Sequence, residues 1–231
     1  MRRPRFLRPR DPAGEDAPAR ERARMVAEQL EARGITDREL LKAFGTVERH
    51  RFVDDAQPYG DHALPVGAGQ TISQPYVVAL MTSAVRPKAG WLNAAVLEVG
   101  TGSGYQAAVL ARLGARVVSI ERHASLAANA RRHLQDTGFA QGVEVVIGDG
   151  TVGWPTRAPY RAILVTAGGP RVPQPLLDQL DPDGGRLVMP IGDREHQELT
   201  LFERSGAEFS SRNLGAVVFV PLIGEHGHSA T

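Results

Sequence analysis

Four residues at regular spacing, Glu98, Gly100, Gly102 and Gly104, have the types and order of a ligand site. They stand where a predicted strand ends and a predicted helix begins, which is where doubly wound parallel sheets bind nucleotides. Glycine lets the chain turn sharply there and lets the backbone approach a ligand closely. The pattern predicts a site for a cofactor that contains a nucleoside.

Further residues are predicted to lie beside this loop. Glu121 follows about 20 residues later and closes the next predicted strand, where a carboxylate can accept hydrogen bonds from ribose hydroxyls. Asp149 and Gly150 close the third strand, and we expect Asp149 to contact an adenine amino group. Taken alone, this pair is equally compatible with an ordinary turn. Together, the three strand ends are expected to converge on one ligand.

The spacing of the glycines separates two cofactors. Dinucleotides commonly use Gly-x-Gly-x-x-Gly, which opens a helix N-terminus to the pyrophosphate. This loop reads Gly-x-Gly-x-Gly after an acid, and the acidic start at Glu98 resembles the first motif of the Rossmann-like methyltransferases. The resemblance implies S-adenosyl-L-methionine as the cofactor.

The segment from Asp61 to Pro75 resembles the signature of the protein-L-isoaspartate O-methyltransferase family. The likeness extends from about Met25 to Leu222 and includes Arg51-Phe52-Val53, Gly148-Asp149-Gly150, Ala158-Pro159-Tyr160 and Phe219-Val220-Pro221-Leu222. It implies that Ser73 is the active-site residue, and we place Thr71 and Ile72 beside the cofactor. It also implies a repair enzyme that methylates the α-carboxylate of L-isoaspartyl residues in aged proteins and peptides. The methyl ester then collapses to a succinimide without enzyme help.

This chemistry needs no general base, because a carboxylate with a pKa of about 4 is already ionised at neutral pH. His62 therefore has no proton to move, and we expect it to be a surface or packing residue. The rate must come from alignment of the carboxylate with the methyl group and from removal of water. We expect Ser73 to position the carboxylate at a helix N-terminus with free amides. A plain helix cap is the alternative role for Ser73.

One segment departs from the family pattern, and other functions compete. Gly168-Gly169 stands where the family usually has two alanines before a proline, which predicts added backbone freedom near the substrate and an altered peptide preference.

The first alternative is a methyltransferase of the same fold that acts on aspartate of a dedicated peptide in natural-product biosynthesis. Such relatives tend to carry an added C-terminal segment, which we do not expect here. Methylation of nucleic acid or a small molecule is a second alternative, but no Asn-Pro-Pro-Tyr-like tetrapeptide follows the fourth predicted strand to hold a base amine. A non-catalytic binding module is a third alternative, and it would bind without turnover.

The elements that position these residues alternate between short apolar runs and helical segments, which predicts a doubly wound α/β fold. Predicted parallel strands cover Ala95–Val99, Arg116–Ile120, Val143–Ile147, Ala162–Thr166 and Arg186–Pro190. Predicted helices cover Ala19–Arg33, a short segment capped by Thr36 or Asp37, Gln74–Val85 with Ser73 as its cap, Tyr105–Leu113, Ala124–Asp136 and Pro173–Leu180. The stretch 54–73 is expected to be an ordered loop without regular structure. Strands at Glu198–Glu203 and Ala216–Leu222 add at least one antiparallel edge strand. We expect a mostly parallel, seven-stranded Rossmann-like sheet with a small N-terminal helical layer.

The composition is that of an ordinary globular protein: 231 residues, 42% hydrophobic and 23% charged. We divide the chain into a disordered tail (1–18), N-terminal helices with the substrate loop (19–90), the cofactor-binding domain (91–224) and a flexible tail (225–231). A net charge of +1 argues against a nucleic-acid partner. The lack of cysteine excludes disulfides and thiolate metal sites, and the N-terminus lacks the apolar run of a signal peptide or membrane span. We expect a cytoplasmic monomer without a metal ion, with His226 and His228 in a frayed terminus rather than a metal site.

Overall fold

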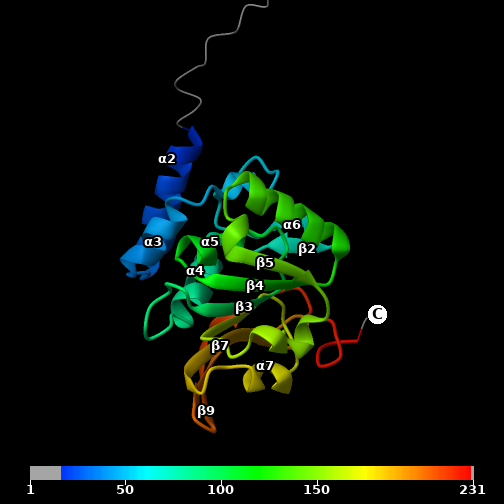
Figure 1. The fold of residues 1–231 in the computed structure, drawn as a ribbon. Helices are drawn as coiled ribbons and strands as arrows, with labels where there is room; N and C mark the ends of the chain where they lie inside the picture. The colour runs from blue at the N-terminus through cyan, green and yellow to red at the C-terminus, as the bar shows by residue number, and fades with distance from the viewer. Residues whose placement is uncertain (1–16, 230–231) are drawn as a thin grey trace, which may run out of the picture.

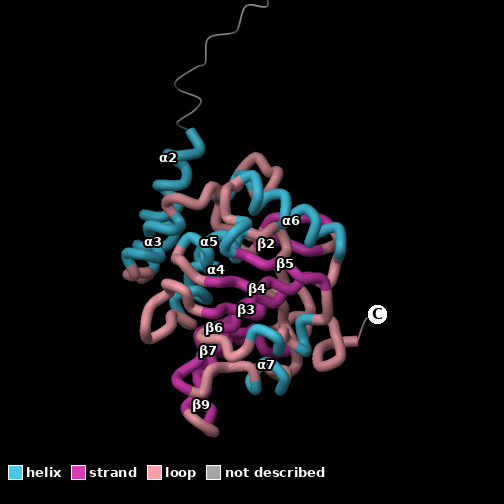
Figure 2. Tube along the Cα trace, viewed as in Figure 1, coloured by secondary structure: helices cyan, strands magenta, loops and turns pink. Residues whose placement is uncertain are grey.

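The computed structural model describes residues 17–229 and places a seven-stranded sheet at the centre of the protein (Figure 1). The strands are β3 (Ala95–Val99), β4 (Arg116–Glu121), β5 (Val143–Ile147), β6 (Ala162–Val165), β7 (Asp183–Gly192), β8 (Gln197–Ser205) and β9 (Glu208–Val217). Their order is β5-β4-β3-β6-β7-β8-β9, which runs down the view of Figure 2. β3 to β7 pair in parallel, and β8 and β9 are antiparallel. The predicted fold class is confirmed, whereas most of the predicted tail 1–18 lies outside the described residues.

Both faces of the sheet are covered, which explains the continuous apolar runs of its parallel strands. Val96 and Leu164 belong to one hydrophobic cluster with residues of two helices, while their neighbours Leu97 and Ile163 point to the opposite face and pack with residues of another helix. The helices of this domain are α4 (Pro75–Ala84), α5 (Tyr105–Arg112), α6 (Ala124–Asp136) and α7 (Gln174–Asp178). The first cluster contains residues of α4 and α5, and the second contains residues of α7.

The connections between strands reverse direction at β3. From β3 the chain continues through β4 to β5, and it then returns to place β6 on the other side of β3. Open α/β sheets bind ligands at the carboxyl ends of the strands beside such a reversal. The fold therefore places the predicted glycine loop, which follows β3, at the usual ligand-binding edge of the sheet.

The N-terminal layer contains an irregular helix where a continuous one was predicted over 19–33. It consists of α2 (Ala17–Arg24), the π-helical η1 (Met25–Leu30) and the 3-10 turn η2 (Glu31–Arg33), and Gly34 ends it in a left-handed conformation (φ 91°). Met25 and Leu30, five residues apart, are both buried, and the wider π turn brings them to one side. The next helix, α3 (Arg38–Phe44), is capped by Asp37, which accepts from the amides of Glu39 and Leu40.

The predicted loop over 54–73 contains a β-hairpin that the sequence analysis missed. Its strands are β1 (Leu64–Gly67) and β2 (Gln70–Ile72). The residues of its turn, 67–69, all have positive φ angles, so the glycine content permits the tight turn instead of preventing strand formation. Leu64 and Ile72 pair across the hairpin and are both buried, which anchors it to the core. Short 3-10 turns complete the fold: η3 (Arg49–Arg51), η4 (Ala140–Gly142), η5 (Gly150–Val152) and η6 (Pro155–Arg157).

The last strand lies earlier than the predicted range Ala216–Leu222. β9 ends at Val217, and most of its residues are exposed, so it has no apolar pattern that could locate it. Its pairing with β8 holds it at the sheet edge. The residues that follow approach the end of β6 instead: the Gly168 amide donates to the Val220 carbonyl (2.8 Å), and the Leu222 amide donates to the Gly168 carbonyl (2.7 Å).

Candidate active site

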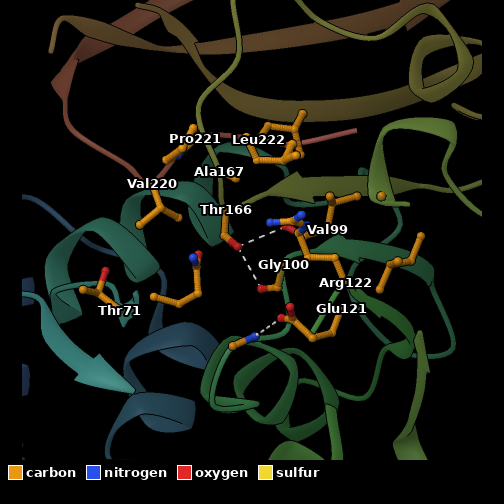
Figure 3. Close-up of a pocket in the computed structure, with 15 residues that line it drawn as sticks. Thr71, Val99, Gly100, Glu121, Arg122, Thr166, Ala167, Val220, Pro221 and Leu222 are labelled. Carbon is orange, nitrogen blue, oxygen red and sulfur yellow. Dashed lines mark hydrogen bonds between the residues drawn. The ribbon is translucent and has the colours of Figure 1, made fainter. Parts of the chain in front are cut away.

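A pocket lies at the carboxyl ends of β3, β4 and β6 (Figure 3). Five of the predicted cofactor residues line it together: Thr71, Gly100, Gly102, Glu121 and Gly150. Two parts of its wall come from distant parts of the sequence, namely the hairpin, with Thr71, and the segment 220–223 after β9. The pocket is thus closed by the two segments whose structure the sequence did not predict.

The glycines of this pocket are needed for space as well as for conformation. A Cβ atom on Gly100 would lie 2.3 Å from Thr166 Oγ1, and one on Gly150 would lie 2.3 Å from Val99 Cγ1. Gly100, Gly102 and Gly104 all have left-handed φ angles (96°, 53° and 90°). Gly104 forms the N-terminal boundary of α5 and shapes the loop without lining the pocket.

Glu121 holds the glycine loop in place and faces the pocket. Its Oε2 accepts from the Gly102 amide (2.9 Å, dashed in Figure 3), and its Oε1 accepts from the His123 amide (3.0 Å). The side chain is almost fully buried. Each carboxylate oxygen accepts one backbone bond and keeps acceptor capacity. The position fits hydrogen bonds from the two hydroxyls of a ribose.

Glu98 lies deeper than the other predicted cofactor residues. It is fully buried, its Oε2 accepts from Ser119 Oγ, and its Oε1 has no partner among the described residues. Burial raises the pKa of Glu98 to about 8, the hydrogen bond from Ser119 opposes this shift, and the charge of Glu121 adds to it. The neutral carboxylic acid is therefore the favoured form of Glu98 at pH 7. It lines a small cavity that it shares with Ile72 and Ser73.

Asp149 binds the C-terminal segment of the described chain. Its Oδ1 accepts from the amide and hydroxyl of Thr151 (2.8 and 2.7 Å), and its Oδ2 accepts from the Glu225 amide (2.8 Å). Burial alone would raise the pKa of Asp149, but these hydrogen bonds outweigh it and hold the pKa below its usual value. The His226 amide also donates, to Thr151 Oγ1, so residues 225 and 226 are bonded where we expected a frayed end. An adenine contact from Asp149 stays a prediction, and it would have to be made beside these donors.

A second cavity, of about 250 Å³, adjoins the pocket and opens between α4 and the residues around the end of β9. We call this second cavity the crevice. Ser73 and Tyr76 line it from one side, and residues 214–220 line it from the other. Thr71 and Thr166 line this crevice, the pocket of Figure 3 and the small cavity beside Glu98. These two threonines therefore mark the place where a bound cofactor and an acceptor in the crevice would meet.

Thr166 had no predicted role, although it closes the fourth predicted strand. Its Oγ1 lies 3.0 Å from the Val99 carbonyl oxygen and 2.8 Å from that of Gly100 (Figure 3). This hydroxyl ties the end of β6 to the glycine loop. Its place at a strand end beside the crevice was the signal that could have identified it.

Ser73 lies at the crevice, but the predicted cap is wrong. α4 begins at Pro75, and Gln74 occupies the N-cap position without a side-chain cap bond. The predicted free amides are also missing from the first turn. Proline has no N–H, the Tyr76 amide lies 3.3 Å from Asp61 Oδ1, and the Val77 amide donates to the Gln74 carbonyl. Asp61 lies 14 residues before Pro75, and the hairpin of β1 and β2 lies between them in the chain, so no local pattern predicts this contact.

The pair Gly168-Gly169 provides close packing instead of the predicted backbone freedom. A Cβ on Gly168 would lie 2.5 Å from the Gln197 side chain, and one on Gly169 would lie 2.7 Å from Met189 Cε. Both residues are buried, and hydrogen bonds fix them on two sides, to the segment after β9 and to β7. The glycines let these segments approach β6 closely.

Other features of the described residues bear on function. His62 is exposed. Within residues 17–229, no group of three or more His, Cys, Asp or Glu side chains has the geometry to hold a metal ion. None of the helices in this range is long and apolar enough to cross a membrane.

A family model and the curated relatives identify the family of this chain. The family model described as protein-L-isoaspartate(D-aspartate) O-methyltransferase matches residues 20–227. A protein-L-isoaspartate O-methyltransferase 1 of Syntrophobacter fumaroxidans is 54% identical over 209 residues, which cover 89% of this chain and 95% of that protein. A protein-L-isoaspartate O-methyltransferase of Methanoregula boonei is 51% identical over 90% of this chain and 94% of its own length.

Solved structures show the same likeness. One protein-L-isoaspartate O-methyltransferase superposes with a TM-score of 0.79 at 30% identity, covering 89% of this chain and 67% of its own. A Plasmodium falciparum structure, solved in complex with S-adenosyl-L-homocysteine, matches with a TM-score of 0.75 at 22% identity over 87% of this chain and 98% of its own. The second likeness concerns the fold alone.

Proposed function

Because the chain belongs to the protein-L-isoaspartate(D-aspartate) O-methyltransferase family, we propose that it transfers a methyl group from S-adenosyl-L-methionine to the α-carboxylate of L-isoaspartyl residues in proteins and peptides. The products are a methyl ester and S-adenosyl-L-homocysteine. The ester then collapses to a succinimide without further help from the enzyme. The activity is therefore one of protein repair.

The observation that carries this proposal is the meeting of two cavities at Thr71 and Thr166. One cavity has the features of a nucleoside site, with a carboxylate at Glu121 for ribose and glycines that admit close approach. The other is an open crevice with Ser73 at its wall. A transfer reaction between a cofactor and a polypeptide side chain requires this arrangement, whereas a binding module needs only one of the two cavities.

The residues divide the work between binding and positioning. S-adenosyl-L-methionine supplies, when bound, a methyl group on a positively charged sulfur, and its transfer to a carboxylate oxygen neutralises both charges. Glu121 and the backbone at Gly100 and Gly102 would hold the nucleoside. Ser73 would orient the acceptor carboxylate, which is already ionised and needs no general base. Thr71 and the segment 220–223 would exclude water from the reacting groups.

The decisive experiment compares two peptides that differ only in one linkage. The purified chain is incubated with methyl-labelled S-adenosyl-L-methionine and a peptide that contains either L-isoaspartate or normal aspartate. We expect labelling of the isoaspartyl peptide only. Equal labelling of both peptides, or of neither, would refute the proposal.

Ser73→Ala tests the positioning role in the same assay. We expect cofactor binding to persist while methyl transfer slows, because the acceptor loses one hydrogen-bond donor. Ser205→Ala, which removes an exposed hydroxyl at the end of β8, serves as the matched control. Unchanged turnover of Ser73→Ala at saturating peptide would remove Ser73 from the mechanism.

Several sequence predictions accompany this proposal without a direct test. The division of the chain near residue 90, the cytoplasmic localisation and the monomeric state remain predictions. The contacts of Glu98 and Asp149 with the cofactor also remain predictions. Measurement of the molecular mass in solution would decide the oligomeric state.

A further inference from the structure

Arg49 is a charged side chain in the core beside the active site. It is fully buried, with no measurable exposure. Its Nε donates to the Pro58 carbonyl (2.8 Å), and its Nη2 donates to the Ser73 carbonyl (2.7 Å). Its Nη1 has no hydrogen-bond partner among the described residues. The guanidinium carbon lies 4.9 Å from the centre of the Tyr105 ring, which fixes it from the side of the glycine loop.

The charge of Arg49 is uncompensated within residues 17–229. No carboxylate of these residues lies within ion-pair distance of it, although Asp61 is close enough to act through space. Asp61 itself is ion-paired to Arg33. Burial lowers the pKa of Arg49 to about 10, against the opposing effects of Tyr105, Asp61 and Tyr59, so the guanidinium stays charged at neutral pH.

The other groups around Ser73 do not offer a free positive charge. The Arg33 guanidinium stacks on the Tyr76 ring, 3.4 Å from its centre, and forms an ion pair with Asp61. The N-terminus of α4 is occupied by Asp61 as well, whose charge would repel a second carboxylate. Glu98 is neutral. Arg33 lines the crevice with its charge paired to Asp61, whereas the guanidinium of Arg49 has no acidic partner among the described residues and acts from the core through the Ser73 backbone.

Such a group is costly for the fold. A buried cation without an acidic partner loses its hydration and recovers only part of it through hydrogen bonds to carbonyls. Replacement of buried ionic groups by apolar residues of similar volume is often neutral or stabilising. Its cost to the fold makes Arg49 a candidate for a functional role.

We propose that Arg49 is a positioning residue for the methyl acceptor: it ties the Ser73 carbonyl to the Pro58 carbonyl and supplies positive charge that favours a carboxylate in the crevice. The inference rests on the proposed function. Arg49 does not touch the reacting atoms. It acts through the Ser73 backbone and through its field, which is strong because the site is buried.

Two variants separate this role from a purely structural one. Arg49→Lys keeps the charge but cannot bridge both carbonyls in the same way, whereas Arg49→Met fills much of the space and removes both the charge and the two hydrogen bonds. Both variants are expected to lose stability, the first through a buried ammonium group and the second through two carbonyls left without donors. If Arg49 only supported the fold, the loss of activity in each variant would parallel its loss of thermal stability.

We expect activity to follow the charge at this position instead. For an isoaspartyl peptide, kcat/KM should decrease from wild type to Arg49→Lys to Arg49→Met, with a loss of about 10²-fold for the last, the size caused by misplacement of a reacting group. The lysine variant should keep a KM near that of wild type and lose mainly kcat, while the methionine variant loses both. Binding of S-adenosyl-L-homocysteine, measured by calorimetry, should remain at the wild-type affinity. Arg38→Met, at an exposed position on α3, controls for the loss of an arginine.

Each alternative result would overturn the inference. These results are a methionine variant as active as the lysine variant, a loss of cofactor affinity that parallels the loss of turnover, or unfolding of both variants at the assay temperature. Thermal unfolding of every variant is measured alongside. A failure of the proposed function looks different, because the wild type itself would then leave the isoaspartyl peptide unlabelled.

Discussion

The pH dependence of folding offers a test of the neutral state of Glu98. The pKa of this fully buried carboxyl is about 8, against 4.5 for the ordinary group. At pH values between 4.5 and about 8, Glu98 of the folded chain holds a proton that Glu98 of the unfolded chain has released. Unfolding free energy therefore falls as the pH rises across this interval. Glu98→Gln replaces the group by a neutral side chain of the same shape and removes this dependence.

The size of the effect follows from the two pKa values. A rise from 4.5 to about 8 corresponds to on the order of 5 kcal/mol at about 1.36 kcal/mol per pH unit. The glutamine leaves amide hydrogens without partners where Glu98 Oε1 already lacks one, at a cost of about 1 to 3 kcal/mol. We expect the variant to be less stable than wild type at pH 4.5 and more stable by a few kcal/mol at pH 8.

Urea denaturation at a series of pH values from 4.5 to 8 measures this difference. The experiment is made without cofactor, because a ligand that binds the folded state adds its own stabilisation. Glu208→Gln, at an exposed position on β9, is the matched control and should run parallel to wild type. Parallel curves for Glu98→Gln and wild type would show that Glu98 is ionised in the fold, and the reasoning from burial would be refuted.

Three further substitutions test the walls of the site. Glu121→Ala should weaken S-adenosyl-L-methionine binding by about 10- to 150-fold in calorimetry, the equivalent of about 1.5 to 3 kcal/mol for charge-assisted hydrogen bonds; unchanged affinity would move the ribose contact elsewhere. Asp149→Ala should accelerate hydrogen exchange of the amides of Glu225 and His226, and protection equal to wild type would show that Asp149 does not hold this segment. Gly168→Ala should destabilise the fold by about 1 to 3 kcal/mol through overpacking against Gln197. Gly148→Ala, where the nearest atom lies 4.0 Å away, should have little effect on stability, and equal losses would contradict the packing argument.

The sheet was predictable because its strands are buried on both faces. β3, β5 and α6 have the predicted bounds, since continuous apolar runs and regular helical spacing are local signals. β7 is longer than predicted at both ends. Its extra residues pair with β8, and such pairing between strands leaves no periodic mark in the sequence of one strand.

The elements that close the site were not predictable from local patterns. The hairpin of β1 and β2 has only short strands, and its turn residues resemble those of a loop. β9 lacks an apolar face because its partner strand, and not the core, holds it. The segment 220–223 reaches the pocket by bonding to Gly168, which lies about 50 residues earlier in the chain. Both walls of the site thus depend on contacts between distant residues.

The cofactor residues illustrate the same distinction. Spacing alone brought Gly100, Gly102, Glu121 and Gly150 to one pocket, because parallel strands end at the same edge of a sheet. The charge state of Glu98 and the bonds of Asp149 could not be derived in this way. Both depend on burial and on the position of chain segments that the sequence does not locate.

The distribution of charge in the site bears on how substrate and product differ. The acceptor enters as an anion and leaves as a neutral ester, so an interaction with a fixed positive charge holds the first and releases the second. Asp61 acts on Arg49 through space, but its ion pair with Arg33 offsets part of its charge, so the buried charge of Arg49 remains partly available to an acceptor. Methyl transfer would remove this attraction, because the ester is neutral, and so would favour release of the product over retention.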